Sequence, residues 1–115
     1  MASRHSYLVR KLSRAIEDVS VEFRGPLYRD GIRCKAVYEN DTVVLDPTNH
    51  DSWDDLVVSF LHEALHHVDI TSGKGDEWLI DEALDRVAFT SPKLRWLASR
   101  KIGDKKFGYV REKQS

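Results

Sequence analysis

Residues 62–67 read His-Glu-Ala-Leu-His-His and place three of the five histidines of the chain next to a glutamate. On a helix, residues four positions apart lie on one face, so the imidazoles of His62 and His66 can converge on one metal ion. Glu63 follows the first histidine, where its carboxylate can take a proton from water activated by the metal and pass it to a leaving group. The spacing predicts a zinc site that hydrolyses amide bonds, with His62 and His66 as ligands and Glu63 as general base.

A catalytic zinc ion (Zn²⁺) needs a third protein ligand and keeps its fourth position for water. Four acidic residues in the next helical stretch are the nearby candidates, Glu77, Asp81, Glu82 and Asp85, and the apolar spacing there places Glu77 and Asp81 at the edge of its buried face. Glu77 is predicted as the third ligand, because its side chain reaches further and it lies in the first turn. Asp81 is predicted to accept a hydrogen bond from a ligand histidine. The reverse assignment, and solvated surface for both acids, are the alternatives.

Two other histidines lie close to this motif. His67 lies toward the apolar side of its helix, so it is predicted to be a partly buried histidine with a hydrogen-bond partner rather than a ligand. His50 stands in the loop TNHDS before the helix. Support of the helix start is its favoured role, and stabilisation of an oxyanion in the transition state is the alternative.

The metal motif needs a helix to hold it, and the apolar periodicity predicts one. Apolar residues recur at helical spacing from Trp53 to Val68, and Ser52 before them is a suitable N-cap. This stripe passes through the motif without a break, while His62 and His66 project from the other side of the helix. The histidines are therefore not expected in the core.

Further helices are predicted at residues 4–18 and 76–89, and from Pro92 to Gly103 after an N-cap at Ser91. Residues 104–115 show no clear period, and this basic tail is predicted to be strand-like or disordered.

Three short segments with β-type patterns, VSVEF, CKAVYE and TVVLD, are predicted strands, with Asp30-Gly31 and Asn40-Asp41 as turn signals. The predicted fold class is α+β: a small, mostly antiparallel sheet packed on the motif helix, with N-terminal and C-terminal helices. TVVLD, residues 42–46, is predicted as an edge strand that holds an extended peptide substrate.

Composition indicates one domain spanning residues 1–115, since 115 residues with 41% hydrophobic content form a single core. No apolar run reaches the 18 residues that a membrane span needs, and no secretory signal pattern is found at the start. A single cysteine, Cys34, fits a reducing compartment. A soluble, cytoplasmic protein is expected.

The basic residues gather at the two ends. Residues 1–14 hold four Lys or Arg and no acid, and residues 91–115 hold eight against two acids. Such ends can bind nucleic acid or an acidic partner, and the alternative is an ordinary solvated surface.

The stretch SFLHEALHHVDITSGKGDEWLIDEALDRVA resembles the core of the small phage and prophage zinc metallopeptidases, a compact zincin group. In that group a short strand and an HExxH helix precede an E-x-x-[VI] helix, matched here by TVVLD, HEALH and DEWLID, so the resemblance covers about residues 40–90. It implies a minimal zincin-like fold, zinc bound by His62, His66 and Glu77, Glu63 as the base, a peptide or protein substrate, and a bacterial or phage-infected cell.

Two rival functions remain open at this point. One is a non-catalytic module that zinc stabilises and that binds nucleic acid or protein. The other is a SprT-like protease acting on nucleic-acid-bound proteins, which would give the basic ends a purpose. Glu63 favours catalysis over the first rival, because a purely structural site has no use for a base.

Overall fold

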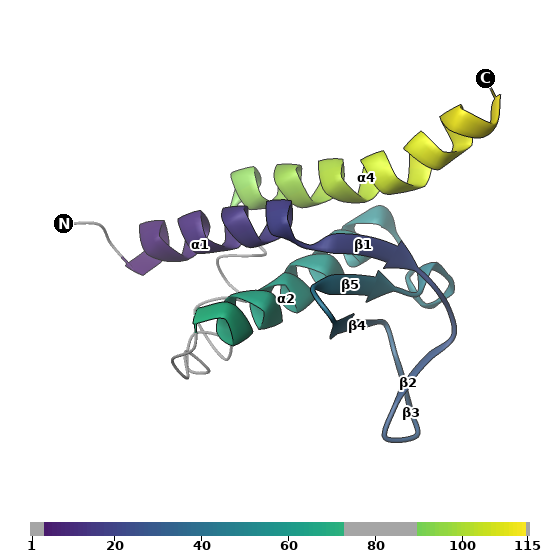
Figure 1. Ribbon diagram of the computed structural model, residues 1–115, viewed down its shortest axis with the longest axis horizontal. Helices are drawn as coiled ribbons and strands as arrows, with labels where there is room; N and C mark the ends of the chain where they lie inside the picture. Colours follow the sequence, from purple (N-terminus) through teal and green to yellow (C-terminus); the bar gives the residue numbers. More distant parts are fainter. Residues whose placement is uncertain (1–3, 73–89, 115) are drawn as a thin grey trace.

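The computed structural model describes residues 4–72 and 90–114, with side chains described for residues 6–68 and 90–104. The elements within these ranges are α1 (Arg4–Asp18), β1 (Ser20–Phe23), β2 (Leu27–Arg29), β3 (Ile32–Cys34), β4 (Ala36–Glu39), β5 (Thr42–Leu45), the 3₁₀ turn η1 (Pro47–Asn49), α2 (Trp53–Ser72) and α4 (Pro92–Gln114). The chain is an α+β domain, as predicted (Figure 1). The predicted helix over 76–89, with Glu77 and Asp81, lies outside the described residues.

The main sheet has the strand order β1-β5-β4. β4 pairs with β5 in antiparallel fashion, whereas β1 pairs with β5 in parallel, with Val21 opposite Val43. The prediction that TVVLD is an edge strand is therefore wrong: β5 is the central strand, and β4 is an edge among the described strands. The residues Val43, Val44 and Leu45 of this strand are fully buried, and β5 has a neighbouring strand on each side.

Two tight turns shape the strands. Asn40 and Asp41, with φ of 50° and 58°, join β4 to β5, and Asp30 and Gly31, with φ of 52° and 79°, join β2 to β3. Positive φ at both turn residues is the geometry of a two-residue hairpin whose twist matches that of its strands. Both turn signals are confirmed. The β2–β3 hairpin forms a separate two-stranded sheet and extends away from the helices (Figure 1).

The helices begin where the capping residues predict. The backbone N–H of Asp55 donates to Ser52 Oγ at 3.1 Å at the start of α2, and that of Leu94 donates to Ser91 Oγ at 3.3 Å at the start of α4. The predicted end at Gly103 is wrong, since α4 continues to Gln114 in place of the strand-like or disordered tail. A glycine inside a helix costs about 1 kcal/mol relative to alanine. Burial of Ile102 beside it offsets that penalty.

One hydrophobic core joins the helices to the sheet. α1, α2 and α4 contact one another, α2 also packs on β4 and β5, and α4 packs on β1. The predicted apolar stripes of α1 and α2 lie in this core. Its largest fully buried side chains are Leu8, Leu12, Ile16, Val19, Val43, Leu45, Phe60, Leu61, Leu65, Leu94 and Ile102. The histidine face of α2 is thus left at the surface. None of the helices in the described part of the chain has the length and apolar character that crossing a bilayer requires.

Candidate metal centre

The helix α2 brings the three motif residues together. Each of His62, Glu63 and His66 offers a ligand atom, and these atoms all lie within 4.8 Å of one another. The two imidazole rings are 5.3 Å apart between centroids and nearly perpendicular, at 85°. Both histidines are half-buried. The predictions that the motif lies on a helix, and that its histidines face away from the core, are confirmed.

Glu63 is buried, with 7% of its surface exposed. Its atom Oε2 is buried without a hydrogen-bond partner among the described residues. Burial raises the pKa of this carboxyl group, and the charges of His66, His62 and Arg29 oppose that rise in part. A buried oxygen with no partner is uncommon in proteins and calls for a bound water or ion, or for a catalytic role. Two converging imidazoles are ligands that suit zinc.

A shallow pocket of about 360 Å³ opens beside the motif. Its lining consists of Lys35, Ala36, Asp55, Val58 and Ser59 together with His62 and Glu63. Ala36 begins the edge strand β4, so this strand runs directly from the pocket. Ser59 lies one helical turn before the motif, and a sequence argument could have found it by its spacing from His62. Lys35 has no such signal, because the fold of the sheet brings it there.

His67 faces the sheet and not the metal centre. It is buried, with 7% exposed, and its Nδ1 lies 2.7 Å from the hydroxyl of Tyr38. The prediction of a partly buried histidine with a hydrogen-bond partner is confirmed.

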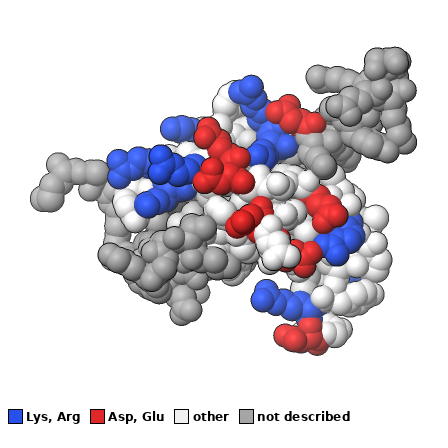
Figure 2. All heavy atoms as spheres, in the orientation of Figure 1, with Lys and Arg blue, Asp and Glu red and all other residues white. Residues whose placement is uncertain are grey.

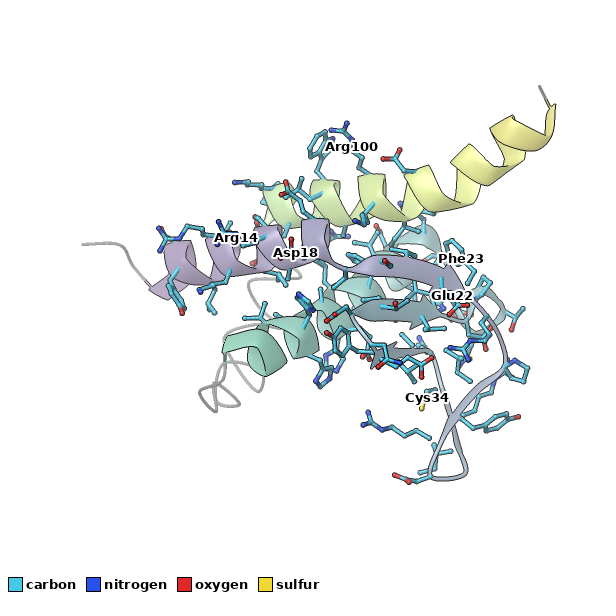
Figure 3. All side chains as sticks on the ribbon, in the orientation of Figure 1. Arg14, Asp18, Glu22, Phe23, Cys34 and Arg100 are labelled. Atoms are coloured by element: carbon cyan, nitrogen blue, oxygen red, sulfur yellow. The ribbon has the colours of Figure 1, made fainter. Side chains whose placement is uncertain are left out.

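His50 uses both of its ring nitrogens within the fold. Nδ1 lies 2.6 Å from the backbone oxygen of Asp46, and Nε2 lies 2.8 Å from Ser59 Oγ. His50 therefore ties the loop before α2 to the helix, and Ser59 is the link between it and the pocket. Cys34, at the base of the β2–β3 hairpin in Figure 3, directs its thiol to the backbone oxygen of Ile32 at 3.4 Å.

Glu77 and Asp81, the two candidates for the third ligand, lie outside the described residues. The described part of the centre is thus the pair of histidines with Glu63. These three residues alone form the group whose donor atoms converge within the described ranges.

Basic side chains gather over α1 and α4, with acidic side chains between them (Figure 2). Arg14 lies on α1 and Arg100 on α4, on the side of the molecule away from the β2–β3 hairpin (Figure 3). Arg100 stacks on Trp96, with its guanidinium carbon 5.4 Å from the ring centroid. Trp96 is 59% exposed, so this helix presents an aromatic and a cationic group together at the surface.

The fold and the centre define a class: a small α+β domain with an HExxH helix packed under a short sheet. Comparison of the chain with protein-family models, with curated proteins and with solved structures gave no match.

Proposed function

We propose that the protein is a zinc-dependent metallopeptidase of the zincin type. The observation that carries the proposal is the convergence of His62, Glu63 and His66 on α2, where both histidines are half-buried and the buried Glu63 Oε2 lacks a partner among the described residues. His62, His66 and Glu77 would hold the zinc ion. Bound there, zinc would supply Lewis acidity, which polarises a carbonyl group and lowers the pKa of water.

The side chains around this centre have separate tasks. Glu63 accepts the proton of the attacking water and delivers it to the leaving amine, since its buried carboxylate faces the same point as the two imidazoles. The edge strand β4 aligns an extended peptide by main-chain hydrogen bonds, in place of the central strand β5. Arg29, on the β2–β3 hairpin, adds positive charge near Glu63.

A catalytic centre fits the structure better than a purely structural one. A structural zinc site closes its fourth position with a cysteine or a histidine. The described residues that could do so are engaged elsewhere: the thiol of Cys34 with Ile32, both nitrogens of His50 with Asp46 and Ser59, and Nδ1 of His67 with Tyr38. None of them belongs to the converging group.

Metal analysis tests the proposal directly. We expect the purified protein to contain one zinc ion per chain, and His62→Ala to contain none. His50→Gln is the matched control, because this histidine lies outside the converging group, and it should keep its zinc. Chelation should lower the melting temperature of the wild type and leave that of His62→Ala unchanged, because a ligand stabilises the folded state that binds it. A wild type that binds no zinc rules out the proposal.

The surface of α4 supports a second proposal, that the basic ends bind nucleic acid, as a protease acting on nucleic-acid-bound proteins would require. An exposed tryptophan beside an arginine can stack on a base while cations hold the phosphates. We expect Trp96→Ala and Arg100→Glu each to weaken binding of a single-stranded oligonucleotide. Tyr28→Ala, an equally exposed aromatic residue on β2, is the control that should bind as the wild type does. If all variants bind the oligonucleotide as the wild type does, nucleic acid is ruled out as a partner of this surface.

A further inference from the structure

The pocket beside the metal centre has two charged walls. Lys35, directly before β4, and Asp55, in the first turn of α2, face each other with Lys35 Nζ 3.0 Å and 2.8 Å from the two carboxylate oxygens. Asp55 also accepts a hydrogen bond from the backbone N–H of Asp51 at 3.2 Å, which holds its carboxylate in place. About half of the Lys35 side chain is exposed, against 24% for Asp55. The pair is internally neutral, so a charged group that enters the pocket must either break it or meet a like charge.

The third polar group of the pocket is the hydroxyl of Ser59, and its hydrogen bond to His50 has a defined direction. His50 Nδ1 lies 2.6 Å from the backbone oxygen of Asp46, which can only accept a hydrogen bond. In the neutral imidazole the proton is therefore on Nδ1, and Nε2 accepts. Ser59, 2.8 Å from Nε2, must then donate its hydroxyl proton to His50. Its oxygen consequently presents lone pairs to the pocket, and the pocket offers an acceptor to an incoming group.

The position of the pocket says which part of a substrate reaches it. His62 and Glu63 form part of its lining, so the pocket adjoins the point where the scissile carbonyl would lie. Val58 contributes an apolar wall from the same helix. A volume of about 360 Å³ has room for one side chain of ordinary size. The residue next to the scissile bond is therefore the one whose side chain enters.

We propose that this pocket selects an uncharged side chain that donates hydrogen bonds, an amide or a hydroxyl, with Ser59 as acceptor and the Lys35–Asp55 pair excluding charges of both signs. The inference rests on the proposed peptidase function and names its substrate preference. Removal of one member of the pair leaves the other without its counter-charge. Asp55 without Lys35 should then admit a cationic side chain, and Lys35 without Asp55 an anionic one.

Peptide binding to the zinc-loaded Glu63→Gln variant tests this selectivity without turnover. The probes are five-residue peptides whose three central positions are all asparagine, all lysine or all glutamate. The same type of side chain then reaches the pocket whichever central residue lies beside it. We expect the asparagine peptide to bind at least about tenfold more tightly than either charged peptide, the ratio that one charge-assisted contact supplies. Ser59→Ala should weaken the asparagine peptide about fivefold, as loss of one hydrogen bond does.

Substitutions of Lys35 and of Asp55 should change the selectivity for charged peptides in opposite directions. Lys35→Ala is expected to strengthen the lysine peptide about tenfold, and Asp55→Asn to strengthen the glutamate peptide by a similar factor. Asp54→Asn is the matched control: this neighbour on α2 pairs with Arg95 outside the pocket, and its substitution should change nothing. Circular dichroism and melting temperatures verify that each variant is folded.

Outcomes for the pocket and for the peptidase activity can be told apart. The inference is overturned if no peptide binds, if the charged peptides bind as well as the asparagine peptide, or if Lys35→Ala and Asp55→Asn act alike. If the binding pattern holds but the zinc-loaded wild type cleaves none of the peptides, the pocket stands and the peptidase function fails. If the wild type cleaves all peptides equally, the function stands and the pocket inference fails.

Discussion

The hydroxyl of Tyr38 lies 2.7 Å from Nδ1 of His67 and fastens the edge strand β4 to α2, at the residue that directly follows the metal motif. The same hydroxyl donates to Asp41 Oδ1 at 3.0 Å. Because the phenol has a single proton, His67 must donate its Nδ1–H to the Tyr38 oxygen when Tyr38 donates to Asp41. The position of β4 over the motif helix therefore depends in part on the third histidine of HEALHH, which the metal chemistry does not use.

Removal of this hydroxyl should destabilise the protein and leave the metal centre intact. We expect Tyr38→Phe to lower the free energy of unfolding by about 1–2 kcal/mol, because His67 Nδ1 and Asp41 Oδ1 both lose their hydrogen bond to the phenol. Zinc content should not change. Urea denaturation with metal analysis measures both. Tyr28→Phe, on an exposed strand of the hairpin, is the control that should match the wild type. Equal stability of Tyr38→Phe and wild type would contradict the link.

The contribution of Tyr38 to the free energy of unfolding should also decrease at alkaline pH. Burial and the hydrogen bond to Asp41 raise the pKa of Tyr38 to about 12. In the unfolded chain a tyrosine ionises near pH 10. Between these values the unfolded state loses a proton that the folded state keeps, so the free energy of unfolding falls as pH rises. We expect the stability difference between wild type and Tyr38→Phe to be full below about pH 10 and to shrink toward pH 12. A difference that stays constant would contradict the shifted pKa.

The contribution of Asp46 to the free energy of unfolding has the opposite pH dependence and is lost in acid. Hydrogen bonds from Thr48 hold the pKa of this carboxyl group below its usual range against the effect of burial, and Arg33 adds to the lowering. Its side chain is fully buried. In acid the unfolded chain takes up the proton first, so the contribution is present above about pH 4 and is lost as pH falls through the lowered value.

We therefore expect Asp46→Asn to reduce the free energy of unfolding by about 1–3 kcal/mol at pH 7, because the hydrogen bonds from Thr48 and from Arg33 lose their charged acceptor. The gap to the wild type should narrow below about pH 4. Asp30→Asn, an exposed residue with positive φ that asparagine adopts equally well, is the control. Denaturation curves between pH 2 and pH 7 give the measurement, and a gap that widens in acid would contradict the assignment.

The parts of the fold that the sequence predicts are those governed by local physics. The stripe from Leu8 to Val19 and the stripe through α2 follow the helical period, and Ser52 and Ser91 cap the helices by bonds within one turn. His62, Glu63 and His66 belong to the same category, because a single helix sets their mutual geometry.

The features that sequence reasoning missed depend on distant packing. The parallel pairing of Val21 with Val43 is decided when β1 docks beside the hairpin β4–β5, and no local signal distinguishes it from an antiparallel pair. The helix α4 continues past Gly103 in spite of this local breaker, and Ile102 beside the glycine is buried in the core. Lys35 reaches the pocket through the sheet, from a position 27 residues before His62.

The proposed chemistry makes its sharpest prediction at Glu63. Replacement by glutamine keeps the shape of the buried side chain and removes the ability to accept a proton. We expect Glu63→Gln to retain zinc, because both imidazole ligands remain, and to lower peptide hydrolysis by about 10²- to 10⁴-fold, the usual contribution of a general base. Zinc stoichiometry and cleavage of a peptide mixture, followed by mass spectrometry, measure the two quantities on the same sample. Ser13→Ala, on α1 and away from the centre, serves as a control that should cleave as the wild type does. A Glu63→Gln protein that carries zinc and cleaves at the wild-type rate would show that another group accepts the proton.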